Sequence, residues 1–225
     1  MAHGAEHITA LLHSPWFLVT WAALMLPSLA ILLIDLRLKN SHLMPLMKWV
    51  WALTVVYSGP LGLAVYWWSG RKEITADGTY RRAARSVAHC YSGCGMGEII
   101  GLTLAVGVLA LSTAATALMT FAFAYVMGFA FTVGPLMQEG TGFGVATRDA
   151  IYSETPSIAV MEIVAIGVDL TLAGDAGPSQ VLFWSSMIVS LTCGLLAAYP
   201  VNILLIRMGV KEGMMDTRNT SHAHT

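Results

Sequence analysis

Charged residues are scarce in this chain of 225 residues: 11% are Asp, Glu, Lys or Arg, whereas 56% are hydrophobic. A soluble domain carries about 25% charged residues, so this composition excludes an ordinary soluble protein. It predicts an integral membrane protein whose main partner is the lipid bilayer, with room for one membrane domain. The formal net charge of −1 also argues against nucleic acid as a partner.

Cysteine is scarce as well, with only Cys90, Cys94 and Cys193, which is too few for a disulfide framework. Several signatures of catalysis are missing. The sequence has no Gly-x-Ser-x-Gly elbow, no His-Glu-x-x-His helix and no glycine loop that ends in Gly-Lys-Ser or Gly-Lys-Thr. These absences leave enzyme activity uncertain and favour a protein that is not an enzyme.

What the chain does have is a series of six long apolar runs. They predict an all-α fold, a polytopic transmembrane helical bundle of about six spans. The expected spans are 15–36, 45–69, 89–111, 114–137, 156–172 and 180–206. Proline predicts a kink in the first span at Pro27, and Gly59-Pro60 predicts a break midway through the second.

These runs divide the chain into four parts. We expect an N-terminal two-span segment (1–70), a basic cytoplasmic loop (71–88), a four-span core (89–209) and a polar tail (210–225). Nine Lys and Arg residues lie in the basic loop, the loop after the fourth span and the tail, whereas three lie between the first two spans. Cytoplasmic loops contain more lysine and arginine than loops on the other side of the membrane. The side with nine such residues includes the tail, so with six spans both termini are predicted to be cytoplasmic. A re-entrant second run would change this count.

One polar motif opens the expected third span. Cys90, Cys94 and Glu98 are spaced four residues apart, so they stack on one helix face, with His89 at its margin. Thiolates suit Cu(I) and Zn²⁺, and a cytoplasmic position would keep both thiols reduced. The motif therefore predicts a soft-metal site, copper before zinc, with Cys90 and Cys94 as core ligands and His89 as the third. One helix alone does not supply the four ligands of a structural zinc site.

Glycine marks the same helix. Gly93, Gly97 and Gly101 have the small-xxx-small spacing that lets a neighbouring transmembrane helix approach closely. The polar motif therefore has a second interpretation, in which the small residues form a helix-packing seam and no ligand binds.

A second polar group is expected in the fifth span. Thr155 and Pro156 read as the N-cap and first residue of that helix. Glu162 and Asp169 then share one face, and Glu162 lies near mid-membrane, where an ionisable residue is costly and should face the bundle interior. Glu98 and Glu162 are expected at similar depths, so the two carboxyls could form one site with Cys90 and Cys94 if the third and fifth spans are neighbours.

Three stretches carry a resemblance to a known family. They are Ser86-x-x-His89-Cys90-x-x-Gly93-Cys94-x-x-Gly97-Glu98, then Glu154-Thr155-Pro156-Ser157 with Glu162, then Tyr199-Pro200-Val201-Asn202 with Gly209, Lys211, Glu212 and Met214. Together they resemble bacterial and archaeal membrane proteins classified only as domain of unknown function 4396.

The resemblance implies a multi-pass protein of a prokaryotic cytoplasmic (inner) membrane and adds Glu154 to the polar residues of interest. It brings no established activity. The chain departs from the family pattern at Pro156, where a leucine is usual, and at Val164-Ala165, where a Gly-Met pair is usual.

Three hypotheses follow for the function. The first is a membrane protein that binds a soft metal ion for transport, delivery or sensing, with Glu98 and Glu162 as polar partners of the thiols. The second is a non-catalytic accessory or assembly subunit of a larger membrane complex, or a homo-oligomer. The third is a proton-coupled transporter of a small solute in which Glu98 and Glu162 form the relay.

Overall fold

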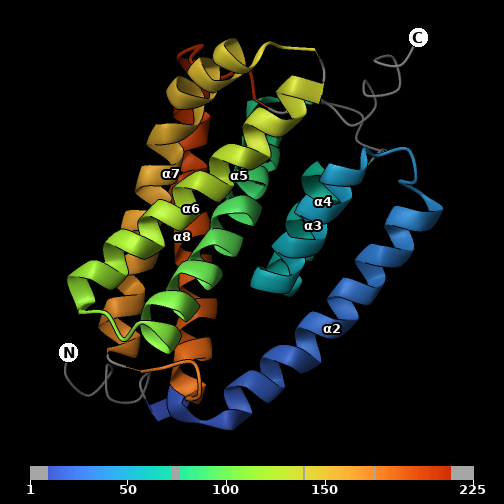
Figure 1. The fold of residues 1–225 in the computed structure, drawn as a ribbon. Helices are drawn as coiled ribbons and strands as arrows, with labels where there is room; N and C mark the ends of the chain where they lie inside the picture. The colour runs from blue at the N-terminus through green and yellow to red at the C-terminus, as the bar shows by residue number, and fades with distance from the viewer. Residues whose placement is uncertain (1–9, 72–76, 139, 175, 214–225) are drawn as a thin grey trace.

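The computed structural model describes residues 10–71, 77–138, 140–174 and 176–213, and the described chain is all-α (Figure 1). Parts of the expected basic loop (72–76) and of the polar tail (214–225) lie outside the described residues. The elements are α2 (Pro15–Leu38), α3 (Pro45–Ser58), α4 (Pro60–Ser69), α5 (Thr79–Leu102), the π-helical turn η1 (Thr103–Val108), α6 (Thr113–Gln138), α7 (Phe143–Ala173) and α8 (Val181–Arg207).

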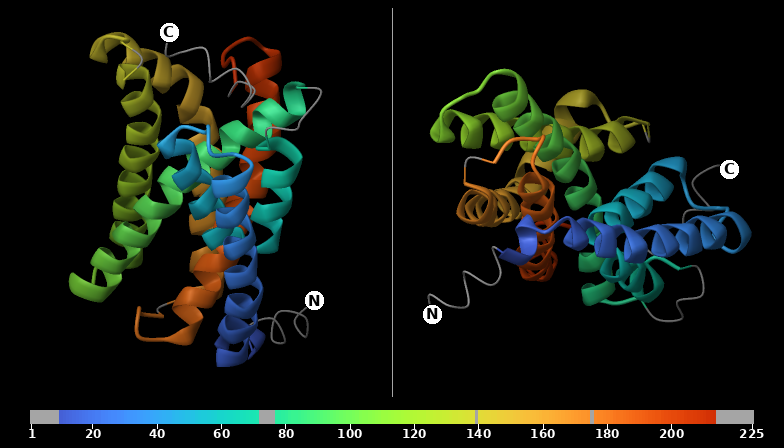
Figure 2. Two further views of the ribbon diagram at one scale, coloured as in Figure 1. Left: turned by 90° about the vertical axis from the view of Figure 1, so that its right-hand side faces the viewer. Right: turned by 90° about the horizontal axis from the view of Figure 1, so that it is seen from below.

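Four long helices, α5 to α8, form the main bundle (Figures 1 and 2). Helix α5 packs against α6 and α8, and α7 packs against α8 and α6. In the most apolar stretches of α5 and α8, 56% of the residues are buried, against 11% in α2. Helices α5 and α8 are therefore the interior helices of the protein, whereas α2 presents most of its surface to lipid.

Five described helices are long and apolar enough to cross a membrane: α2, α5 with η1, α6, α7 and α8. The prediction of a multi-pass helical membrane protein is confirmed in this form. The expected second span is not among the five, because it is divided into α3, with 14 residues, and α4, with 10. At 1.5 Å per residue neither helix covers the roughly 30 Å of a bilayer core.

Helices α3 and α4 form a hairpin that turns back partway along the bundle (Figure 1). The turn is at Gly59, whose φ of 55° is left-handed, and Pro60 begins α4. Gly62 lets α4 lie directly on α3, because a Cβ there would be 2.7 Å from the carbonyl oxygen of Thr54. The break predicted at Gly59-Pro60 therefore reverses the chain rather than merely bending a spanning helix.

Two helices begin earlier than expected. Helix α5 begins at Thr79, not His89, because Arg81 to Arg85 are good helix formers despite their charge. Arg85 is buried at its start and pairs with Asp77 at 2.7 Å. The His-Cys motif consequently lies well inside the helix rather than at its mouth.

Helix α7 begins at Phe143, so Pro156 lies inside it and Thr155 is not an N-cap. The Thr155 hydroxyl is instead 2.8 Å from the hydroxyl of Tyr125 on α6. Ala146 and Ala150, which precede the proline, are buried against Val133 of α6. This packing holds the first part of α7 in helical form and outweighs the hydrogen bond that the proline cannot make.

The hairpin has a consequence for the ends of the chain. Helix α2 starts at the lower end in Figure 1, the hairpin starts and ends at the upper end, and α8 finishes at the upper end. The first and last described residues, Ala10 and Gly213, thus lie at opposite ends of the bundle. Two cytoplasmic termini would need an even number of crossings, and the described helices long enough to cross number five, so the side of each terminus stays a prediction.

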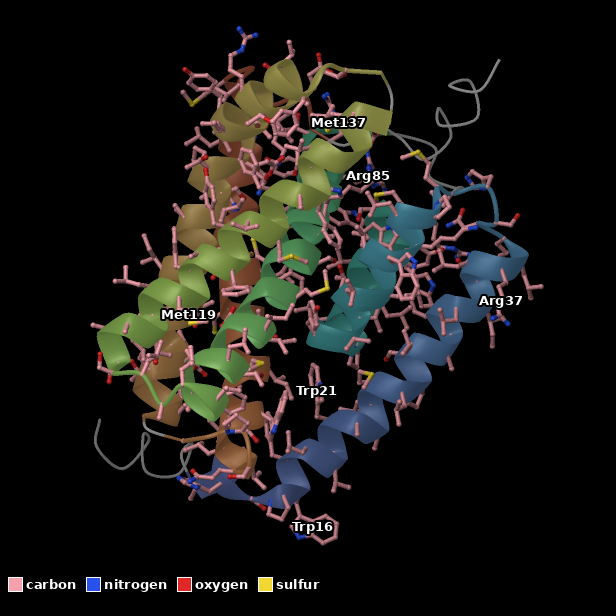
Figure 3. All side chains as sticks on the ribbon, in the orientation of Figure 1. Trp16, Trp21, Arg37, Arg85, Met119 and Met137 are labelled. Carbon is pink, nitrogen blue, oxygen red and sulfur yellow. The ribbon has the colours of Figure 1, made fainter. Side chains whose placement is uncertain are left out.

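The upper end carries the positive charge, and we call it the basic end. Every lysine and arginine in the described parts of the chain lies at this end, in the residues Arg37, Lys39, Lys48, Arg71, Arg81, Arg82, Arg85, Arg148, Arg207 and Lys211. Figure 3 labels two of them, Arg37 and Arg85. The turns at the opposite end, 109–112 and 174–180, contain no lysine or arginine.

Candidate functional site

The glycine face of α5 lies against α6. A Cβ at Gly93 would lie 2.9 Å from the Cα of Gly128, and one at Gly101 would lie 2.8 Å from the Cα of Thr120. At Gly97 a Cβ would lie 2.5 Å from the Cα of Ala124 and closer still to the Phe123 carbonyl oxygen. The two backbones approach this closely only because the three α5 positions have no side chain.

The two thiols lie beside this seam in the bundle interior. Cys90 and Cys94 are 1% and 0% exposed, and their Sγ atoms are 3.8 Å apart. The Cys94 sulfur lies over Gly128 of α6, where a Cβ would be 2.7 Å from it. Cys94 therefore occupies space between α5 and α6 that depends on a glycine on the facing helix. Cys193 is only partly buried and belongs to α8.

Two carboxyls lie deeper in the bundle. Glu98 of α5 and Glu162 of α7 are both 0% exposed, and none of their four carboxyl oxygens has a hydrogen-bond partner among the described residues. Each lies the same number of residues beyond the start of its helix, and α5 contacts α7. The charge of Glu162 acts on Glu98, and Glu162 lies beside Cys90 and Cys94. Four groups from two helices thus share one buried region.

Asp169 continues this region toward the end away from the basic end. It is 6% exposed, and its Oδ1 accepts a hydrogen bond of 2.7 Å from the Ser186 hydroxyl on α8. A pocket of about 10 Å³ lies between Asp169 and Glu98, with Thr116 and Thr120 of α6 in its lining. This is about the volume that one water molecule needs. Polar side chains from α5, α6 and α7 therefore connect Glu98 to Asp169.

At the basic end the region is closed by an ion pair. Lys211, which follows α8, donates to Glu154 of α7 at 2.7 Å and to the Asn202 Oδ1 at 3.1 Å. Both ion-pair side chains are buried, 8% and 6% exposed. The Asn202 amide nitrogen in turn donates to the Ser157 hydroxyl at 2.6 Å. Removing either charge would leave the other buried without a partner, which is costly.

These groups form a continuous set that we call the polar line. It consists of Glu154, Cys90, Cys94, Glu162, Glu98 and Asp169. On α7 its members are seven or eight residues apart and share one face, and on α5 they are four apart. The polar line runs from the Lys211 ion pair at the basic end to the Ser186 hydrogen bond near the other end.

His89 does not join the thiols. Its ring meets Phe131 of α6 edge-on at 6.1 Å between centroids, and its charged neighbours are Glu154 and Lys211. Its Nε2 has no hydrogen-bond partner among the described residues. Within the part of the chain that the structure describes, no three His, Cys, Asp or Glu side chains are arranged to hold a metal ion. Cys90, Cys94 and His89 do not form such a cluster in the described residues, and their role as metal ligands stays a prediction.

Sequence reasoning missed part of this region. It gave no role to Lys211 and Asn202, although both lie in stretches that carry the family resemblance. A buried role for Lys211 could not be read from its place in a polar tail. Ser186 carried no signal, because a lone serine in an apolar helix usually bonds its own backbone. It does also donate to the Phe183 carbonyl oxygen, at 3.1 Å.

The fold and the polar line define a class: a multi-pass membrane protein with ionisable groups buried between its helices α5 and α7. More particularly, the chain belongs to the family described as Domain of unknown function (DUF4396), whose model matches residues 79–211. The match begins with α5 and ends at Lys211, so it covers the main bundle and the closing ion pair. No curated protein and no solved structure matches the chain.

Proposed function

We propose that the protein is a proton-coupled membrane transporter and that Glu98 and Glu162 are its proton-binding groups. One observation carries the proposal: two fully buried carboxyls on adjacent crossing helices have no hydrogen-bond partner among the described residues. An unpaired carboxylate in a membrane interior is costly, and such residues are typical of proton relays. A proton on either carboxyl removes its charge.

The rest of the polar line supports a pathway rather than an isolated site. Asp169 and the small pocket continue the path from Glu98 away from the basic end, and Glu154 continues it from Glu162 toward that end. The Lys211–Glu154 ion pair closes the path at the basic end. We interpret the structure as a closed state in which the ion pair must open before the carboxyls exchange protons with water.

A soft metal ion, copper before zinc, is the second candidate, and it would be the cargo. The supporting observation is the 3.8 Å separation of the two buried thiols, with Glu162 beside them. Because thiols and carboxyls must lose protons to bind a metal, metal entry would release protons. The two hypotheses are compatible, since one site can exchange a metal ion for protons.

Purified protein in proteoliposomes with a pH-sensitive dye inside tests both candidates. Proton movement is followed after a potassium–valinomycin potential alone, after added Zn²⁺ and after added Cu⁺. We expect wild-type protein to move protons in at least one condition and the Glu98→Gln/Glu162→Gln variant to move none. Asp149→Asn, which changes an exposed carboxyl of α7, is the matched control and should behave as wild type.

The outcomes separate the hypotheses. Proton movement that the double Gln variant retains would contradict a relay through Glu98 and Glu162. Movement that depends on Zn²⁺ or Cu⁺ and is lost in Cys90→Ser/Cys94→Ser would assign the metal as cargo. No movement in any condition would contradict transport and leave the packing role of an accessory subunit, for which co-purification of partner subunits is the test.

We also propose an orientation: the basic end is cytoplasmic and α2 begins on the other side of the membrane. The support is that every described lysine and arginine lies at one end. The three that the six-span scheme placed outside, Arg37, Lys39 and Lys48, join the others once α3 and α4 form a re-entrant hairpin. For a prokaryotic protein this membrane would be the cytoplasmic membrane.

A further inference from the structure

A groove lies between α2 and α3 at the basic end, away from the polar line. Its volume is about 350 Å³, and its wall is apolar, formed by Leu33 and Leu36 of α2 and Ala52 of α3. Two cations, Arg37 and Lys48, lie in the same lining, one from each helix. The groove therefore combines an apolar wall with positive charge at one end of the membrane span.

The two cations are not neutralised by carboxylates in the groove. No acidic residue belongs to its lining, and the nearby Asp35 is engaged by Arg71 at 3.0 Å and by the Tyr66 hydroxyl at 2.7 Å. Lys48 donates one hydrogen bond, at 2.6 Å, to the Ser41 carbonyl oxygen. An ammonium group has three donors and a guanidinium has five, so donors remain for an anion.

The position of tryptophan places the groove at the membrane surface. Trp49, which also lines it, is 66% exposed, and Trp16 at the opposite end of α2 is 72% exposed. Exposed tryptophans are typical of the two interfaces between lipid and water. Figure 3 shows Trp16 and Arg37 at opposite ends of α2. Arg37 and Lys48 are thus at the level of lipid headgroups, and the apolar wall extends toward the acyl chains.

We propose that this groove binds an anionic phospholipid. The phosphate lies between Arg37 and Lys48, and one acyl chain lies along Leu33, Leu36 and Ala52. Basic pockets between transmembrane helices are suited to anionic headgroups, because charge attraction there adds to burial of the chain. The lipid would hold α2 to the hairpin, since each helix supplies one of the two cations. The proposal does not depend on the transport hypothesis.

Native mass spectrometry of the full chain in detergent tests the proposal, with phosphatidylglycerol and phosphatidylcholine titrated in parallel. We expect wild-type protein to retain more phosphatidylglycerol than phosphatidylcholine. Arg37→Gln/Lys48→Gln should weaken that retention by roughly tenfold. Lys39→Gln/Arg148→Gln removes the same charge from the same end outside the groove and should retain lipid as wild type does.

The apolar wall has its own variant. Ala52→Trp fills the groove without changing any charge, so it should also reduce retention of phosphatidylglycerol. Ala30→Trp, at an exposed position of α2 outside the lining, is its control. Excess inorganic phosphate should not displace the lipid, because it lacks the acyl chain.

Several results would overturn the proposal. They are equal retention of both lipids by wild-type protein, equal losses in the two charge variants, no effect of Ala52→Trp, or displacement by phosphate alone. A lipid-free dimer whose formation is lost in Arg37→Gln/Lys48→Gln would assign the groove to a second copy of the chain instead.

Discussion

At the residue scale, glycine decides how closely α5 and α6 pack. A Cβ at Gly97 would overlap the backbone of Phe123 and Ala124, and backbone cannot move aside as a flexible side chain can. The seam therefore holds α5 in the rotation that turns Cys90, Cys94 and Glu98 into the bundle.

Gly97→Ala should destabilise the protein, by about 1–3 kcal/mol in free energy of unfolding, because it overpacks a close helix contact. Thermal or denaturant unfolding in mild detergent measures this. Gly167→Ala is the matched control: nothing lies within 4 Å of its added Cβ. Alanine is the better helix former, so this control should be neutral or slightly stabilising. Equal effects of the two changes would contradict the seam.

The buried ion pair gives a second prediction. Lys211→Met leaves Glu154 buried and unpaired, and should cost about 3–5 kcal/mol in free energy of unfolding. Glu154→Gln leaves Lys211 unpaired and should have a cost of the same order. The double variant should recover most of the loss, because neither charge remains. A double-mutant cycle of unfolding measurements checks this, and additive losses would show that the two residues do not interact.

At this scale the sequence indicated which ionisable residues are buried, because burying a charge is costly. It did not indicate which residues pair with partners far away in the sequence. Glu98 and Glu162 were expected to face the bundle interior because they stand in apolar runs, and both are 0% exposed. Lys211 and Ser186 could not be assigned, because their partners Glu154 and Asp169 are distant along the chain. His89 was expected at the margin of the thiol face, and its ring lies against Phe131 of α6.

At the scale of elements, the hairpin of α3 and α4 depends on one residue. Gly59 has a φ of 55°, and a Cβ there would lie 3.1 Å from the Trp21 ring of α2. The tip of the hairpin thus packs on α2, and Figure 3 shows Trp21 between the two.

Gly59→Ala should therefore cost about 1–2 kcal/mol in free energy of unfolding, because a left-handed conformation is unfavourable for a residue with a side chain. The measurement is unfolding in detergent, with Gly134→Ala for comparison. Gly134 lies inside α6 with nothing within 4 Å of an added Cβ, so its change should be neutral or slightly stabilising. A harmless Gly59→Ala would be inconsistent with the turn described.

Helix type and number of apolar runs followed from the sequence, but helix starts and crossings did not. The segment with Arg81, Arg82 and Arg85 was predicted to be a loop, because spans were assigned by hydropathy. Hydropathy takes no account of the high helix propensity of arginine. Pro156 read as a helix start because the packing of Ala146 and Ala150 on α6 is tertiary information. The run 45–69 is long enough to span, and only the left-handed turn at Gly59 divides it.

At the scale of the whole molecule, the proposed topology of five crossings and one re-entrant hairpin can be tested. Single cysteines can be placed in exposed positions at Ser41, Gly142 and Ser179 in a background without the native cysteines. A membrane-impermeant maleimide should label Ser41→Cys and Gly142→Cys from one face and Ser179→Cys from the other. Six crossings would instead place Ser41→Cys with Ser179→Cys.

The same arrangement bears on how the chain enters the membrane during synthesis. Helices α5 and α6 form one helical hairpin and α7 and α8 form another, each joined by a short turn away from the basic end. Those turns, 109–112 and 174–180, carry no lysine or arginine. Each pair can therefore insert as a unit from the side of the basic end without a cation passing through the bilayer. The four helices that the family model covers therefore do not depend on α2 or the α3–α4 hairpin for their insertion into the membrane.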